Sequence, residues 1–249
     1  MTELAQVEAA ARRLEARLGE APPTAVVLGS GLGGIADAVE EPVTASFAEV
    51  GFPSTGVSGH TGTVTSGLLG AQRVTALAGR LHLYEGHPVA AVVRATRALA
   101  RWGVQRIVFT SAVGSVNPSL HPGTVVRITD HINLTGVNPL IGPNIDELGP
   151  RFPDLSDAYD ARLGAQVDQL AQDMGLPLPV GIYGGVLGPS YETAAEVQML
   201  HRLGADVVGM SLISEVIAAV HAGLRVVAFG IVTNPGTGLG DGSVSHDSV

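Results

Sequence analysis

Two glycine-bracketed segments carry groups suited to binding an anion. Gly29-Ser-Gly-Leu-Gly-Gly34 follows a short apolar run and is expected to open a helix, so its backbone amides and the helix dipole can hold a phosphate. In Gly79-Arg-Leu-His-Leu-Tyr-Glu-Gly86, an extended backbone would place Arg80, His82 and Tyr84 on one face. A guanidinium suits bidentate recognition of phosphate oxygens. The two segments together predict a phosphate site.

Both segments also have simpler interpretations. Residues 29–34 match G-x-G-x-x-G, a pattern found in dinucleotide-binding folds and in turns that need glycine only for backbone geometry. A dinucleotide site also needs an acidic residue after the second strand, and Phe47-Ala-Glu-Val-Gly-Phe-Pro53 offers no clean example. The hydroxyl of Ser30 at the tip of the loop favours phosphate. The segment around Arg80, taken alone, could be an exposed strand face.

Two further turns carry side chains that could meet a ligand. His60 stands between glycines in Ser58-Gly-His-Thr-Gly62, where it could contact or gate a phosphate or be only a turn residue. Gly188-Pro-Ser-Tyr-Glu-Thr193 joins an apolar run to a helix. Glu192 could accept a proton-bearing nitrogen of a base while Tyr191 packs on its ring, or it could be a first-turn acid favoured by the helix dipole.

Polar residues also end two apolar runs near the C-terminus. Val208-Gly-Met-Ser211 supplies a methionine and a hydroxyl, and the buried run 229–234 ends in Thr233 and Asn234. A methionine alone is usually a core residue. Polar residues at the end of a buried strand favour a functional interpretation.

An alternation of strands and helices is the arrangement that would bring these loops together. Leucine, valine and alanine recur at spacings of three and four over residues 4–18, which predicts an opening helix that ends near Gly19. Apolar runs predict strands at Ala25–Leu28, Arg106–Thr110, Thr124–Ile128 and Arg225–Thr233. Helices are expected at Pro88–Trp102, Asp157–Met174, Thr193–Leu203 and Leu212–Ala222.

These elements predict an α/β fold. We expect one domain over residues 1–249, with a mixed, mostly parallel twisted sheet flanked by helices on both faces. In such sheets the loops at the carboxyl ends of the strands build the ligand site. The glycine-rich loops are therefore expected to converge on one pocket.

Composition excludes several classes of protein. The 249 residues are 45% hydrophobic and carry a net charge of -9, which argues against nucleic-acid binding. The chain has no cysteine, so it can form no disulfide or thiolate metal site. The apolar region Val207–Val232 is interrupted by Glu215, His221 and Arg225, which favours a buried helix and strand over a membrane span. With no targeting segment in view, we expect a cytoplasmic protein without membrane partners.

Taken together, the segments resemble the trimeric purine nucleoside phosphorylase family over almost the whole chain. The matching stretches are Leu28–Gly34, Gly59–Gly62, Arg80–Gly86, Asp130–Leu134, Asn138–Asn144, Arg151–Tyr159, Gly188–Thr193, Val208–Ser211 and Thr233–Asn234. Several separate segments in the family's order are far more specific than any one motif. The resemblance implies a nucleoside phosphorylase-like fold and phosphorolysis of purine nucleosides, namely inosine, guanosine and their deoxy forms, in purine salvage.

The resemblance also assigns roles to individual residues. The phosphate would be bound by Ser30, His60, Arg80, His82, Ser211 and the backbone at Ala112. The nucleoside would be bound by Tyr84, Phe152, Tyr191, Glu192, Met210, Thr233, Asn234 and His246. Of these, Asn234, Glu192 and His82 are the expected catalytic residues, with Asn234 donating to the imidazole-ring nitrogen of the departing purine. Phosphate is a co-substrate, and no metal or other cofactor is expected.

The resemblance has further implications and some departures. The family is a homotrimer in which an aromatic residue of the neighbouring subunit closes the sugar end of the pocket, and Phe152 matches that residue. Ser111 stands where the family usually has asparagine, which changes one polar contact near phosphate and base. The glycine-rich stretch 235–243 is expected to act as a lid over the base. The family's last helix, which would follow Ser245-His246, is expected to be missing before Val249.

Three alternatives stay open on the sequence. A methylthioadenosine phosphorylase would share the phosphate machinery, but those enzymes replace the glutamate at Glu192 and carry an acid near Asn234, whereas this pair favours 6-oxopurines. A noncatalytic purine nucleoside-binding protein is slightly favoured by Ser111 and the short C-terminus. A dinucleotide-dependent oxidoreductase is the third alternative.

Overall fold

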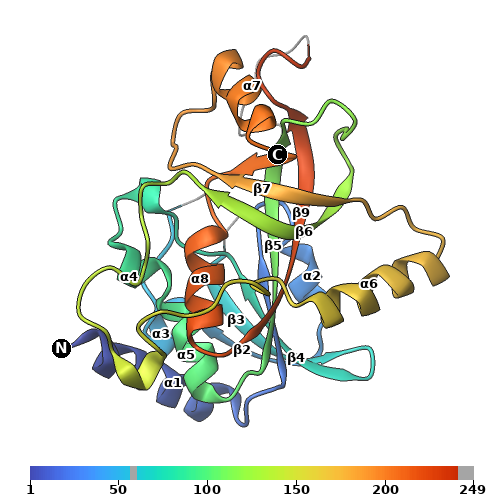
Figure 1. Ribbon diagram of the computed structural model, residues 1–249. Coiled ribbons are helices and arrows are strands. Elements are labelled where there is room, and N and C mark those ends of the chain that lie inside the picture. The colour runs from blue at the N-terminus through green and yellow to red at the C-terminus, as the bar shows by residue number, and fades with distance from the viewer. Residues whose placement is uncertain (57–60, 241–249) are drawn as a thin grey trace.

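A mixed β-sheet forms the centre of the computed structural model, which describes residues 1–56 and 61–240 (Figure 1). Its strands are β1 (Thr24–Leu28), β2 (Glu40–Ser46), β3 (Thr63–Leu69), β4 (Gln72–Ala78), β5 (Arg106–Ser115), β6 (Val125–Asn133), β7 (Val180–Gly185), β8 (Val207–Gly209) and β9 (Arg225–Pro235). The helices are α1 (Glu3–Leu18), α2 (Gly34–Asp37), α3 (Phe47–Val50), α4 (Val89–Val92), α5 (Arg94–Trp102), α6 (Ala161–Asp173), α7 (Ala194–Arg202) and α8 (Ile213–His221), with 3-10 turns at η1 (Leu83–Glu85) and η2 (Asp146–Leu148).

The strand order within the described residues is β2-β3-β4-β1-β5-β8-β7-β6-β9, and β5 also pairs with β9. The parallel pairs are β1–β4, β1–β5, β5–β9, β6–β7 and β7–β8. The antiparallel pairs are β2–β3, β3–β4, β5–β8 and β6–β9. The prediction of an α/β fold with a mixed sheet is confirmed, with parallel pairs in a narrow majority.

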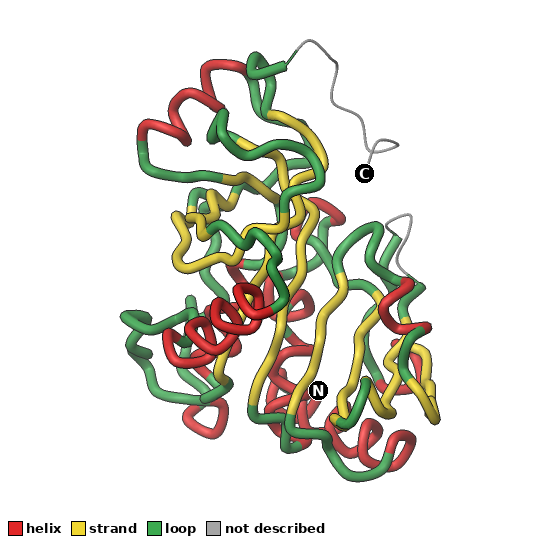
Figure 2. The backbone as a smooth tube through the Cα atoms, turned by 90° about the vertical axis from the view of Figure 1, so that its right-hand side faces the viewer, coloured by secondary structure: helices red, strands yellow, loops and turns green. Residues whose placement is uncertain are grey.

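Helices cover both faces of the sheet, and β1 shows why. Ala25 and Val27 lie in the main hydrophobic cluster with α1, α5 and α8, whereas Leu28 lies in a second cluster, packed with Val26 and α2. Side chains alternate between the two faces of a strand, so a strand apolar on both faces needs cover on both. In the side view of Figure 2, α6 lies in front of the long strands and other helices lie behind them.

The expected elements near the N-terminus and in the last third are present. α1 begins after Thr2, whose hydroxyl accepts a hydrogen bond from Ala5 N, and ends before Gly19, whose φ is 80°. The apolar region that starts at Val207 forms β8, α8 and β9. No helix in the described part of the chain is long and apolar enough to span a membrane.

Several expected boundaries were wrong. The helix expected over Pro88–Trp102 is two helices, α4 and α5, because Val93 leaves helical geometry at φ -92° and ψ 0°. α6 begins later than expected, where the Asp160 carboxylate accepts a hydrogen bond from Leu163 N and caps it. The loop at residues 29–34 opens only the four-residue helix α2. β2, β3, β4, β7 and β8 were not predicted, since the region from Val207 was expected to begin with a helix.

The segment from Gly79 to Gly86 also differs from the prediction of an extended strand. Leu83–Glu85 form the 3-10 turn η1, and the Glu85 carboxylate accepts the backbone N–H of His82 at 2.8 Å. Arg80, His82 and Tyr84 therefore do not share a strand face.

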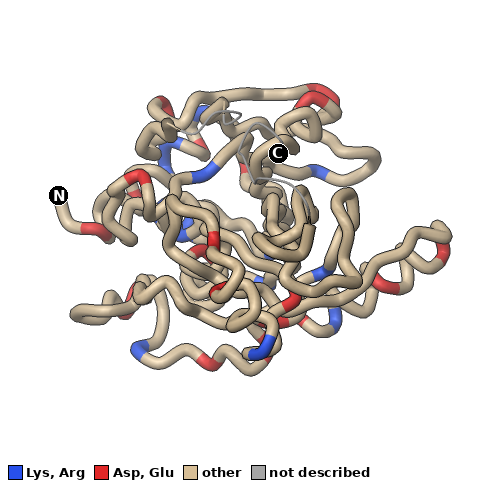
Figure 3. The backbone as a smooth tube through the Cα atoms, turned by 90° about the horizontal axis from the view of Figure 1, so that it is seen from above, with Lys and Arg blue, Asp and Glu red and all other residues tan. Residues whose placement is uncertain are grey.

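All basic residues of the chain apart from histidine are arginines. Seen from above, they lie among acidic residues over much of the molecule (Figure 3).

Candidate active site

The ends of four neighbouring strands gather most of the predicted residues. β4, β1, β5 and β9 are parallel neighbours, so their carboxyl ends lie at one edge of the sheet. Ser30 follows β1, the segment from Arg80 to His82 follows β4, Ala112 lies late in β5 and Asn234 lies near the end of β9. The topology thus brings distant segments to one place.

A cavity of about 100 Å³ lies at this edge. It is lined by Ser30, His82, Tyr84, Ala112, Gly114, Tyr191, Glu192, Val208, Gly209, Met210, Ser211 and Asn234. Of these, Gly114, Val208 and Gly209 were not predicted as site residues. The predicted phosphate and nucleoside residues therefore largely share one cavity.

Ser211 lies in a buried polar network at one end of the cavity. Its hydroxyl is 3.0 Å from that of Ser111, and its backbone N–H donates to the Tyr183 hydroxyl at 3.2 Å. Tyr183 is fully buried, and burial raises the pKa of its phenol. A Cβ on Gly209 would lie 2.2 Å from this phenol oxygen, so only glycine fits there without a shift. Ser111 thus contacts a predicted phosphate residue directly.

Arg80 lies behind the cavity wall and does not line the cavity. It is 4% exposed, donates to the carbonyl of Thr110 at 2.6 Å, and places Nε 2.9 Å from Glu215 Oε2. Burial raises the pKa of Glu215, and the guanidinium opposes this effect. Sequence reasoning missed Glu215 as a partner, because it stood out only as an interruption of an apolar run.

A carboxylate holds His82 in place. His82 Nδ1 lies 3.4 Å from Glu85 Oε1, and the other Glu85 oxygen accepts Gly56 N–H at 2.8 Å. Partial burial opposes ionisation, but the hydrogen bonds from Gly56 and His82 lower the pKa of Glu85. The Tyr84 ring stacks on that of His82, with centroids 4.8 Å apart, and burial followed by the charge of Glu85 raises its pKa to about 12. Tyr84 is therefore a neutral phenol at the cavity wall.

Glu192 and Asn234 supply an acceptor and a donor to the same cavity. Burial raises the pKa of Glu192. Thr233 donates its hydroxyl to Asn234 Oδ1 at 2.9 Å, and Asn234 Nδ2 donates to the Pro235 carbonyl at 3.0 Å. A Cβ on Gly114 would lie 3.3 Å from Asn234 Nδ2 and from Val208. The amide is thus oriented and closely packed.

The remaining predicted residues lie outside this cavity or outside the described residues. Thr233 does not line the cavity, although it contacts Asn234. Phe152 is 87% exposed and lies on a loop away from the cavity lining. His60 and His246 fall outside the described residues. Among the described residues, 1–56 and 61–240, no group of three or more His, Asp or Glu side chains is placed to share a metal ion.

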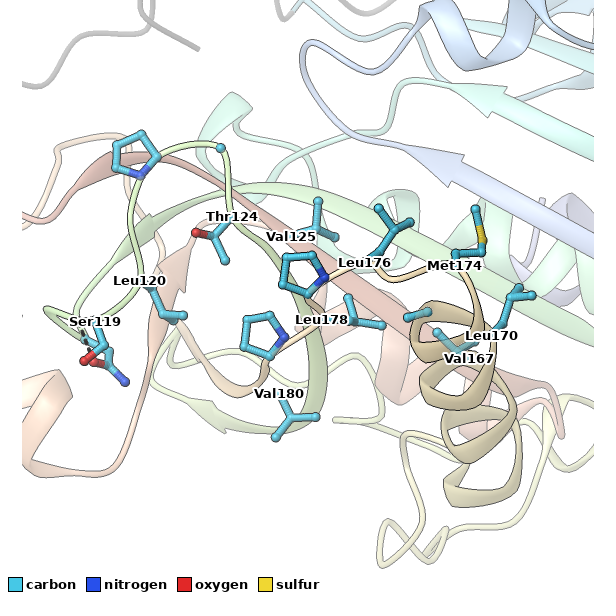
Figure 4. A pocket seen from close by; sticks show the side chains of 16 residues that line it. Ser119, Leu120, Thr124, Val125, Val167, Leu170, Met174, Leu176, Leu178 and Val180 are labelled. Atoms are coloured by element: carbon cyan, nitrogen blue, oxygen red, sulfur yellow. Dashed lines mark hydrogen bonds between the residues drawn. The ribbon is translucent and has the colours of Figure 1, made fainter.

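A separate apolar groove of about 1050 Å³ lies beside α6. Leu170 of α6 and Met174, which directly follows the helix, line it together with Leu176, Leu178 and neighbouring apolar side chains (Figure 4). It contains none of the predicted site residues and no ionisable side chain, so size alone does not locate the chemistry.

The comparisons with known proteins agree on one family. The family model described as the phosphorylase superfamily matches residues 23–249. Purine nucleoside phosphorylase 1 of Bacillus subtilis is 43% identical over 245 residues, covering 98% of this chain and 90% of the relative. The chain belongs to the purine nucleoside phosphorylase family.

Other members agree in sequence and fold. The Bos taurus purine nucleoside phosphorylase is 42% identical over 219 residues, covering 86% of this chain and 76% of its own length. The crystal structure of the Schistosoma mansoni purine nucleoside phosphorylase in complex with adenosine superposes with a TM-score of 0.93 at 36% identity, covering 100% of this chain and 91% of that one. A purine nucleoside phosphorylase in complex with ribose-1-phosphate gives a TM-score of 0.90 at 38% identity, covering 95% and 90% of the two chains.

Proposed function

We propose that this member of the purine nucleoside phosphorylase family uses the cavity at the ends of β1, β4, β5 and β9 to split purine nucleosides with phosphate. The products are the free purine base and ribose 1-phosphate or its deoxy form. One observation carries the proposal. The cavity brings the hydroxyls of Ser30 and Ser211 together with the carboxylate of Glu192 and the amide of Asn234.

The proposed reaction forms one bond and breaks another. A phosphate oxygen attacks the anomeric carbon, and the electron pair of the carbon–nitrogen bond leaves with the base. Positive charge develops on the sugar and negative charge on the purine, so groups that stabilise both lower the barrier. The phosphate anion, held by Ser30, Ser211 and the backbone at Ala112, stabilises the sugar. Asn234 stabilises the purine by donating to its imidazole-ring nitrogen.

Glu192 and Asn234 also support a preference for 6-oxopurines. The ring nitrogen next to the 6-oxo group carries a hydrogen and donates a hydrogen bond to the ionised Glu192 carboxylate. An unprotonated ring nitrogen, as in adenine, would instead face the carboxylate lone pairs. Leaving a buried carboxylate without a donor lowers affinity, so inosine and guanosine are favoured over adenosine. Tyr191 and Met210 supply apolar surface beside the base and sugar.

A homotrimer completes this proposal. Phe152 is 87% exposed, with Ile141 at 79% and Leu155 at 37% nearby in sequence. Exposed apolar side chains of this size are typical of surfaces that other proteins cover. In the proposed trimer Phe152 reaches the sugar end of a neighbour's cavity, and Phe152→Ala then raises the nucleoside KM without changing the phosphate KM.

The decisive assay follows inosine cleavage with and without phosphate. We expect phosphate-dependent release of hypoxanthine and ribose 1-phosphate, with much slower turnover of adenosine and none of methylthioadenosine. Equal turnover of adenosine contradicts the 6-oxopurine preference. Nucleoside binding without cleavage would identify a noncatalytic binding protein. The cytoplasmic location stays a prediction from the sequence.

A further inference from the structure

The carboxylate of Glu215 joins α8 to the segment that follows β4. Its Oε2 lies 2.9 Å from Arg80 Nε, and the side chains are 6% and 3% exposed, respectively. A buried ion is tolerated only when a partner compensates its lost hydration. Each side chain therefore restricts where the other can lie.

The same carboxylate supports the turn that carries Ser211. The backbone N–H of Leu212 acts on this carboxylate and lowers its pKa, and Ser211, Leu212 and Glu215 line one small cavity together. Leu212 has φ 67° and ψ -60°, and Ile213 N donates to the Ser211 carbonyl at 2.8 Å across it. This is a γ-turn with positive φ, which is strained for any residue but glycine and persists only when its surroundings hold it. The buried Glu215 carboxylate belongs to those surroundings.

We propose that Glu215 is a positioning residue for phosphate, acting through the Ser211 turn and through Arg80, which donates to the Thr110 carbonyl two residues before Ala112 in β5. The inference rests on the proposed function of the cavity. Glu215 does not line the cavity that contains Ser30 and Ser211. Its negative charge is balanced by the Arg80 guanidinium, so it orders the phosphate site without presenting a bare charge to the anion.

The substitution Glu215→Gln separates charge from shape. The amide keeps a carbonyl that can accept Leu212 N–H, but its NH2 group meets the N–H groups of Arg80. We expect the phosphate KM to rise at least about tenfold, as for loss of a charged hydrogen bond. The inosine KM at saturating phosphate stays within about twofold, because Glu192 and Asn234 belong to other segments. A merely structural role would lower the amount of active enzyme and leave both constants unchanged.

A double-mutant cycle tests whether Glu215 acts through Arg80. Arg80→Met alone raises the phosphate KM, and adding Glu215→Gln raises it no further, since the guanidinium to be positioned is gone. Multiplying effects would overturn the proposal. Glu3→Gln is the matched control. Glu3 does not line the cavity, and it forms ion pairs with Arg94 at 3.1 Å and with Arg97 at 3.9 Å. The phosphate KM of the Glu3→Gln variant therefore stays at the wild-type value.

A second variant and a binding measurement test the role of Glu215 if Glu215→Gln does not fold or turnover is absent. If Glu215→Gln does not fold, Glu215→Asp replaces it, because the shorter carboxylate cannot hold both partners, and the same rise in phosphate KM is expected. Calorimetric titration with inorganic phosphate reports binding without turnover. Wild-type enzyme that binds phosphate but never cleaves inosine contradicts the proposed function alone. Equal phosphate affinity in the wild type and the folded Glu215 variant refutes the positioning role.

Discussion

Replacing Asn234 with alanine removes the donor that the account places on the departing purine. The structure indicates how much should be lost. Thr233 holds Oδ1 at 2.9 Å, Pro235 accepts one Nδ2 hydrogen at 3.0 Å, and Gly114 packs against the amide. The second Nδ2 hydrogen is therefore aimed by fixed neighbours before the substrate binds. A preorganised donor of this kind contributes about 3–4 kcal/mol to the transition state, or roughly a hundred- to a thousandfold in kcat.

The assay is steady-state cleavage of inosine at saturating phosphate. We expect kcat to fall by that factor, while the affinity for phosphate, measured by calorimetry, stays unchanged. Thr233→Val is the graded control, because it removes only the hydroxyl that orients the amide. One neutral hydrogen bond is worth about 1 kcal/mol, which corresponds to roughly a fivefold loss of kcat. A kcat for Asn234→Ala close to that of the wild type would show that Asn234 does not stabilise the departing purine.

The other predictions concern binding and stability. Burial raises the pKa of Glu192, so its carboxylate gains a proton at a higher pH than an ordinary glutamate. The inosine KM is expected to rise as the pH falls through this raised pKa, because the protonated group no longer accepts the purine N–H. Glu192→Gln should remove this rise at acidic pH. Gly209→Ala would place a methyl group 2.2 Å from the buried Tyr183 hydroxyl, which predicts a loss of roughly 1–3 kcal/mol in unfolding free energy and a higher phosphate KM. Leu14→Ala empties a fully buried position in α1 and is expected to lower the unfolding free energy by about 2–5 kcal/mol in denaturant titration, with KM values unchanged.

The convergence of the site was predictable because it follows from strand direction. Glycines and polar residues after apolar runs marked Ser30, Glu192 and Asn234, and parallel strands bring such ends together. Five of the nine strand pairings in the described sheet are parallel. Three of them join β4, β1, β5 and β9, so the carboxyl ends of these four strands lie at the same edge.

The orientation of Arg80 was not predictable from spacing. Period two placed it beside His82 and Tyr84, but Glu85 closes a 3-10 turn by accepting His82 N–H, and Glu215 from α8 holds the guanidinium. Both contacts come from carboxylates whose reach is set by tertiary packing. A glutamate in an otherwise apolar helix was the available signal for such a buried partner.

The missed strands have a local explanation. β2 is exposed along most of its length and contains Pro42, so it lacks the apolar alternation that marks a strand. β3 and β4 form an antiparallel pair joined at Gly70, and their serine, threonine and glycine residues hide the pattern. Pairing with neighbours, rather than intrinsic preference, establishes these strands.

A crystal structure with inorganic phosphate and an inosine analogue that cannot be cleaved would show whether phosphate and purine share the cavity at the ends of β1, β4, β5 and β9. We expect phosphate oxygens against Ser30, Ser211 and the backbone at Ala112. We expect the purine between Glu192 and the Asn234 amide. A purine bound in the apolar groove beside α6, or a phosphate that touches none of these donors, would contradict it.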